Sequence, residues 1–94
     1  MPDSSNRVIV TVVGQDRTGI IAETSRVLAD ANANIIDISQ TLLGEFFVMI
    51  LIADMTRASV AFEELKSRLA AKAAELGMRI DAQHEDVFKF MHRV

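Results

Sequence analysis

One stretch, residues 45–53, most constrains what this chain can fold into. Its letters are EFFVMILIA, and every residue after Glu45 is apolar. In an extended strand alternate side chains point to opposite faces, so this strand would be apolar on both sides. Phe46, Val48, Ile50 and Ile52 lie on one face, and Phe47, Met49, Leu51 and Ala53 lie on the other. Such a strand is typical of the centre of a sheet that is covered on both faces.

The rest of the chain predicts two helices and three further strands. Strands are expected at residues 7–13 (closed by Gly14), 35–43 and 78–84, and helices at 19–31 and 59–76. The sequence NAN at 32–34 is a helix stop, because asparagine tolerates the left-handed conformation. Gly44 marks a hairpin before the central strand, and Ile36, Ile38 and Leu42 share one face of the strand that precedes it.

The two ends of the chain lie outside this pattern. Residues 1–6 are expected to form a flexible tail, and residues 7–94 a single domain. Within the C-terminal segment 85–94, Val87, Phe88 and Met91 have the spacing of a short helix.

The order β-α-β-β-α-β predicts an α+β, ferredoxin-like sandwich. Right-handed crossovers give a four-stranded antiparallel sheet with two helices on one face. Two helices cover only that face, although the central strand is apolar on both. The C-terminal segment, a second subunit, or both must therefore cover the other face, and a homodimer is the expected assembly.

Composition excludes several classes of protein. The 94 residues carry a net charge of −3 with no basic cluster, which argues against nucleic-acid and anionic membrane surfaces. There is no cysteine, so thiolate metal sites and disulfides are excluded, and a reducing cytoplasm fits. The start MPDSSNR has no apolar core of a secretory signal, and residues 46–53 are too few to cross a bilayer.

The turn after the first strand is the candidate site. Gly14 to Gly19 satisfies G-x-x-x-x-G, but the Lys and Ser or Thr of a nucleotide-binding loop are missing, since Ile20 and Ile21 follow. The backbone N–H groups of a helix N-terminus suit a carboxylate, and Asp16 suits an ammonium group, so an α-amino acid fits both. The alternative is structural: Asp16 or Thr18 caps the helix. At Gly19 we expect no room for a Cβ.

The motifs of this region resemble the ACT domain, a small amino-acid-sensing module. The matching features are G-x-D-R-x-G-I-I in the turn, V-L-A-x-x-N-x-N-I through the first helix, and D-I-S-Q in the next strand. Further features, ISQT, F-x-M-x-x-x-x-D and HEDVFKFMHRV, are similar to the freestanding, UPF0237-like single-domain members of the family. The resemblance covers nearly the whole chain. It implies a non-enzymatic regulatory module, without a cofactor, that pairs with a second copy.

The resemblance also implies a ligand site between two subunits. The turn of one subunit faces the region after the first helix of its neighbour. Asn34 would offer an amide to the polar end of the ligand, and Ile35 and Ile36 would border the side chain of the ligand. An equally good explanation of Asn32 and Asn34 is that they terminate the helix. The implied positions are Asp16, Arg17, Thr18, Gly19 and Ile20 on the turn, and Asn32, Asn34, Ile35 and Ile36 facing them.

The sequence offers three alternatives to an amino-acid site. An acylphosphatase-like hydrolase of the same fold uses an arginine at this turn and a nearby asparagine, which Arg17 and Asn34 would mimic. RNA-recognition modules need basic strands with stacking aromatics, and this acidic chain has no Trp or Tyr. A metal site at His84, Glu85, Asp86 and His92 matches no ligand spacing, so no metal is expected.

Overall fold

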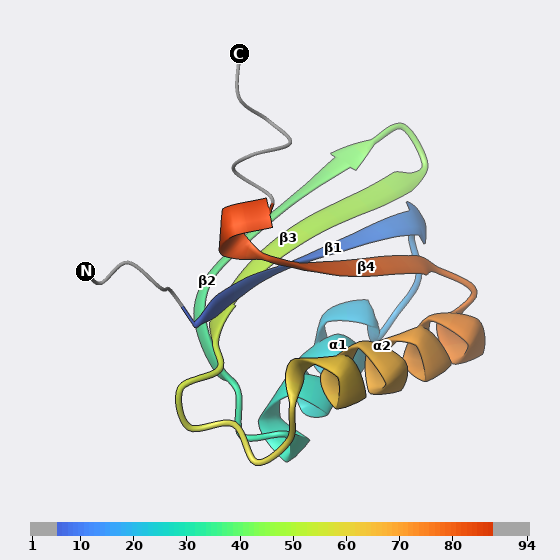
Figure 1. Ribbon diagram of the computed structural model, residues 1–94. Helices are drawn as coiled ribbons and strands as arrows, with labels where there is room; N and C mark the ends of the chain where they lie inside the picture. The colour runs from blue at the N-terminus through green and yellow to red at the C-terminus, as the bar shows by residue number, and fades with distance from the viewer. Residues whose placement is uncertain (1–5, 88–94) are drawn as a thin grey trace.

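Strands and helices follow one another in the predicted order β-α-β-β-α-β (Figure 1). The computed structural model describes residues 6–87. The elements are β1 (Arg7–Gln15), α1 (Ile20–Asp30), β2 (Asn34–Leu43), β3 (Phe46–Asp54), α2 (Phe62–Leu76) and β4 (Arg79–His84). The predicted strands and helices between residues 7 and 84 are all present, with bounds that differ by up to three residues.

The four strands form one antiparallel sheet in the order β2-β3-β1-β4. Both helices lie on the same face of this sheet (Figure 1). This is the ferredoxin-like fold, so the predicted fold class is confirmed. The central strands are β3 and β1, and β2 and β4 are the edges.

The hydrophobic core lies between the helices and the sheet. Alternate residues of β1 and β3 point into it, as the period of a strand requires. Leu28 of α1 and Leu65 and Leu69 of α2 are almost fully buried against them. The strand residues of this core are Val8, Val10 and Val12 of β1 and Phe47, Met49, Leu51 and Ala53 of β3.

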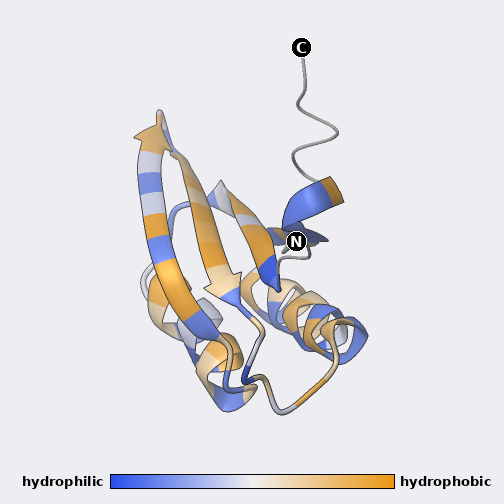
Figure 2. Ribbon diagram, turned by 60° about the vertical axis from the view of Figure 1, so that its left-hand side comes forward, coloured by the Kyte–Doolittle hydropathy of each residue, from blue (hydrophilic) through white to orange (hydrophobic). Residues whose placement is uncertain are grey.

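The opposite face of the sheet carries an apolar stripe along its two central strands. Figure 2 shows β3 as an almost continuous hydrophobic ribbon. Phe46 is 50% exposed and Ile50 is 39% exposed on this face, so the outer side of β3 is only partly covered. Beyond β4 the chain enters a helical turn at residues 85–87, on the side of the sheet away from the helices (Figure 1). The rest of the predicted C-terminal helix, with Phe88 and Met91, lies outside the described residues.

Gly14 does not close the first strand, which continues to Gln15. The reason for a glycine here is contact with Met78. A Cβ added to Gly14 would lie 2.5 Å from the Met78 Sδ atom, which is closer than real side chains pack. Gly14 therefore makes room for the residue that leads from α2 into β4, while β1 stays paired with β3.

A β-bulge changes the predicted pattern of β2. Ile35 pairs with Ala53 and Asp37 pairs with Ile52, so Ile36 is the extra residue between them. Ile36 is 44% exposed, whereas Ile35 and Ile38 pack against the core. The prediction that Ile36, Ile38 and Leu42 share one face is therefore wrong for Ile36, because the inserted residue shifts the alternation by one.

Candidate functional site

The turn between β1 and α1 leaves the first N–H groups of the helix available. Gly19 is the N-cap residue, with φ +90°, and no side chain within residues 6–87 bonds to the helix start. The amide of Glu23 donates to the Gly19 carbonyl, while the N–H groups of Ile20, Ile21 and Ala22 precede the first intrahelical bond. Neither Asp16 nor Thr18 therefore caps α1, and the structural alternative for these two residues is not what the geometry supports.

Gly19 is required for its backbone conformation and not for space. A positive φ of this size is strained for a residue with a Cβ. A Cβ at Gly19 would have no neighbour within 4 Å, so the expectation that none would fit is wrong. The turn is fixed from the other side by the Asp16 amide, which donates to the Glu45 carbonyl in the β2–β3 hairpin at 3.1 Å.

A pocket of about 310 Å³ lies at this turn. It combines the Asp16 carboxylate and the uncapped helix start with an apolar wall that includes Phe47 of β3. Its lining residues are Asp16, Arg17, Gly19, Ile20, Ile21, Ala22 and Phe47. Thr18, which the family resemblance also implied, is exposed at the turn and does not line the pocket.

Arg17 has a structural partner. Its Nη1 atom donates a hydrogen bond to the Leu76 carbonyl at 3.1 Å, at the C-terminal end of α2. A cation at this end of a helix stabilises the partial negative charge of the last carbonyls. The guanidinium group therefore connects the β1–α1 turn to α2.

The opposite end of α1 presents the second set of predicted residues. Asn32 adopts the left-handed conformation, with φ 57°, and its Nδ2 atom donates to the Arg57 carbonyl at 2.8 Å. Asn32 thus terminates the helix and also fastens the loop between β3 and α2. Asn34 is exposed as the first residue of β2, and no hydrogen bond of its side chain occurs within residues 6–87.

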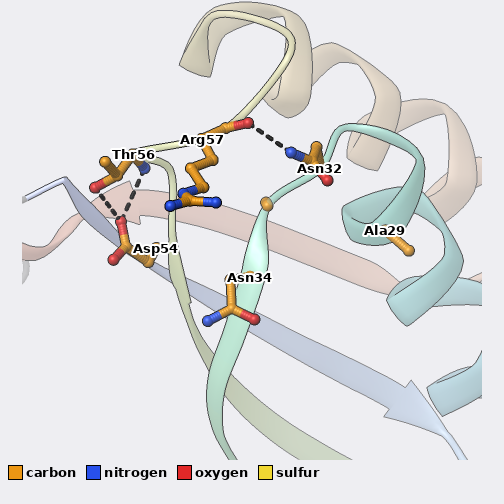
Figure 3. Close-up of a pocket in the computed structure, with 7 residues that line it drawn as sticks. Ala29, Asn32, Asn34, Asp54, Thr56 and Arg57 are labelled. Atoms are coloured by element: carbon orange, nitrogen blue, oxygen red, sulfur yellow. Dashed lines mark hydrogen bonds between the residues drawn. The ribbon is translucent and has the colours of Figure 1, made fainter.

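A larger pocket, of about 650 Å³, lies between the segment that joins α1 to β2 and the loop that follows β3 (Figure 3). The Asp54 Oδ1 atom accepts hydrogen bonds from the Thr56 amide at 2.8 Å and the Thr56 hydroxyl at 2.6 Å. These bonds, led by the one from the hydroxyl, lower the pKa of the Asp54 carboxyl below its ordinary value. The pocket is lined by Ala29, Asn32, Ala33, Asn34, Asp54, Thr56 and Arg57.

The motifs of the sequence do not assign Asp54, Thr56 and Arg57 to a site. Two signals pointed to them. Asp54 is the last residue of the F-x-M-x-x-x-x-D strand, and D-x-T after a strand is a common turn in which a carboxylate accepts from the backbone two residues on. The loop that these residues begin is brought beside Asn32 only by the fold.

The two predicted sets of residues do not meet within one chain. They lie at opposite ends of α1, whose eleven residues span about 16 Å. The turn positions surround one pocket, and Asn32 and Asn34 line the other. Ile35 packs against the core, and Ile36 is exposed at the bulge of β2. Arg17 and Asn34 are likewise too far apart to hold one phosphate in a single chain.

The histidine cluster gains no support from the described residues. The Asp86 amide donates to the His84 Nδ1 atom at 3.2 Å, and His92 lies beyond the described range. Between residues 6 and 87 no group of three potential ligands is arranged to hold a metal ion. In the same range, neither helix has the length and apolar character needed to span a bilayer.

The chain is similar to known proteins over nearly its whole length. The ACT domain family matches residues 6–83. A UPF0237 protein of Methanocaldococcus jannaschii is 53% identical over 89 residues, which cover 95% of this chain and 99% of that protein. An ACT domain protein from Streptococcus pneumoniae has 34% identity and a TM-score of 0.79, covering 92% of this chain and 97% of that one.

A more distant structure shares the fold alone. The regulatory subunit of aspartate kinase from Thermus thermophilus has a TM-score of 0.67 at 19% identity, and the match covers 87% of this chain and 53% of that one. The match of the family over most of the sequence, and close relatives that align from end to end, settle the classification. The chain belongs to the ACT domain family, whose members are small-ligand-binding regulatory modules.

Proposed function

We propose that this protein is a non-enzymatic regulatory module that binds an amino acid between two copies of the chain in the cytoplasm. The observation that carries the proposal is the position of the two pockets at opposite ends of α1. Each pocket contains only part of a site for an α-amino acid. A second copy, turned end for end, would bring the two parts together.

The turn supplies one part of the recognition. Uncapped N–H groups at Ile20 and Ile21 suit a carboxylate, because the helix dipole places partial positive charge there. The carboxylate of Asp16, which lines the same pocket, suits an ammonium group. Asn34 from the other copy would donate to the polar end of the ligand, and Ile35 and Ile36 would border its side chain.

The edge strand β2 is the surface that allows this arrangement. It is ten residues long and, in the part of the chain that the structure describes, has a sheet neighbour on one side only. Antiparallel pairing of two β2 strands would place the two α1 helices next to each other in opposite directions, because α1 contacts β2. The turn of each copy would then face the Asn32–Ile36 segment of the other.

A hydrolase of the acylphosphatase type receives less support. Its arginine would have to face the substrate, but Arg17 donates to the Leu76 carbonyl, and Asn34 lies at the far end of α1. Acetyl phosphate is the test substrate. Hydrolysis that disappears in Arg17→Ala would contradict the non-enzymatic proposal.

The binding proposal is tested by calorimetry with each standard amino acid. We expect at least one to bind, and Asp16→Asn to weaken it by about tenfold or more, the scale of one charge-assisted hydrogen bond. Asp16→Asn is preferable to Gly19→Ala, which would also strain the backbone at φ +90°. The control is Asp81→Asn, an exposed aspartate on β4. Unchanged affinity in Asp16→Asn would remove Asp16 from the site, and no binding by any amino acid would contradict the proposal.

A further inference from the structure

The pocket at the C-terminal end of α1 holds two opposite charges that the site proposed above does not use. Asp54 ends β3, and Arg57 follows in the loop before α2. Figure 3 shows both side chains on the same side of the pocket, with the guanidinium group of Arg57 directed between the Asp54–Thr56 pair and Asn34. The hydrogen bond from Asn32 to the Arg57 carbonyl holds the loop in this position.

Both charges are available to a ligand. The Arg57 side chain forms no ion pair with any residue in the described range 6–87, although its backbone is fixed. The Asp54 carboxylate uses one oxygen, Oδ1, for both of its bonds to Thr56. The second oxygen accepts no hydrogen bond within residues 6–87, although the charge of Arg7 on the neighbouring strand β1 also lowers the pKa of this carboxyl.

The two charges of the pocket favour one orientation of a bound zwitterion. An ammonium group is favoured beside the Asp54 carboxylate, which lines the pocket. A carboxylate is favoured at the guanidinium fork of Arg57, with the amide of Asn34 as a further donor.

We propose that Asp54 and Arg57 complete the recognition of the amino acid, so that each charge of the ligand is held from both chains. Asp54 binds the ammonium group together with Asp16 of the second copy, and Arg57 binds the carboxylate together with the start of α1 of that copy. The inference rests on the proposed function and adds the two charged residues to its site. The volume of about 650 Å³ leaves room for the ligand and for the turn of a second copy, which closes the pocket.

The experiment is an NMR titration of the ¹⁵N-labelled chain with each standard amino acid, followed by a charge-matched set of probes. L-alanine carries both charges, L-alaninamide lacks the carboxylate, and propionate lacks the ammonium group. We expect L-alanine to shift the amide signals of residues 32–34 and 54–57, with both single-charge probes binding about tenfold more weakly. Arg57→Gln should reduce the affinity for L-alanine toward that for L-alaninamide, and should not affect L-alaninamide.

Two further variants separate charge recognition from folding. Asp54→Asn retains an oxygen for Thr56, and should selectively reduce the binding of probes that carry an ammonium group. Arg68→Gln is the matched control, since Arg68 lies on α2 and pairs with Glu64 at 3.0 Å; it should bind all probes as the unaltered chain does. Shifts confined to residues 16–22, with unchanged binding by Arg57→Gln and Asp54→Asn, would overturn this inference and leave the proposed function intact. No shifts with any amino acid would overturn both.

Discussion

At the scale of single residues, Thr24 is the one that conflicts with its surroundings. It is fully buried in α1, and its Oγ1 atom has no hydrogen-bond partner within residues 6–87. A buried hydroxyl without a partner costs free energy of folding, because it has lost its hydrogen bonds to water. The position therefore tolerates a polar group and does not depend on it.

Thr24→Val is predicted to stabilise the protein. Valine has the same shape and a similar helix propensity, so the change removes the unpaired hydroxyl and little else. We expect the free energy of unfolding to rise by about 1 kcal/mol, measured by urea denaturation. Thr41→Val, at an exposed position of β2, is the control and should change it by less than about 0.5 kcal/mol. A clear loss of stability in Thr24→Val would mean that the hydroxyl has a partner in the preceding helical turn.

At the scale of elements, Arg17 connects two parts of the fold that are far apart in sequence. Its hydrogen bond to the Leu76 carbonyl joins the β1–α1 turn to the end of α2, and an ion pair between Lys72 and Glu23, at 3.0 Å, joins the two helices nearby. The position of the turn therefore depends in part on α2. This gives Arg17 a role that requires no ligand.

Arg17→Met tests that role. It retains an unbranched side chain of similar length but removes the donor at the helix end, so we expect unfolding to become easier by about 1 kcal/mol with amino-acid affinity changed less than about twofold. Arg68→Met, which loses only an exposed ion pair, should cost about 0.5 kcal/mol or less. Urea denaturation and calorimetry on the same samples give both quantities. If affinity falls and stability does not, Arg17 belongs to the ligand site.

The elements themselves could be predicted because each has a strong local signal. β3 is apolar from Phe46 to Ala53. α1 is followed by Asn32 and α2 by Gly77, and both residues adopt the left-handed conformation that ends a helix. The start of α2 could not be predicted. The Ser59 amide donates to the Ala31 carbonyl at 2.8 Å, so the chain remains non-helical until Ala61, whereas the sequence predicts a helix from residue 59. That contact is between distant residues, and no local pattern indicates it.

The site was predictable to the same extent. The turn from Asp16 to Ile20 and the asparagines after α1 could be found because they form continuous motifs. Arg57 could not, since its loop is brought beside the end of α1 by hydrogen bonds between distant residues, from Asn32 to the Arg57 carbonyl and from the Ser59 amide to the Ala31 carbonyl. The bulge at Ile36 could not be predicted either. A strand rich in β-branched residues has the same composition with or without one inserted residue, so the sequence gives no sign of it.

At the scale of the whole molecule, the described part of the sheet offers a second copy the apolar stripe of β1 and β3 and the edge strands β2 and β4. We predict a dimer at low micromolar concentration that uses the β2 edge. Ile36→Asp would place a charge on that edge in both copies, and should convert the dimer to monomer in sedimentation experiments.

Ile50→Asp is the matched variant, because Ile50 lies on the stripe with a similar exposed fraction, 39% against 44% for Ile36. It should leave the dimer intact. Dissociation by Ile50→Asp alone would show that the stripe is the interface and that the two halves of the site are not joined through β2. A monomer in the unaltered chain would contradict the assembly altogether.

The separation of the two pockets by the length of α1 has a consequence for how such a protein would respond in the cell. If each ligand contacts both chains, every dimer has two equivalent sites, and association and ligand uptake are thermodynamically linked. Ligand then pulls chains together, and a higher concentration of protein raises the apparent affinity for ligand. Such a protein would respond to two concentrations, its own and that of the metabolite. A change in its expression would therefore change the metabolite concentration at which it responds, without any change in sequence.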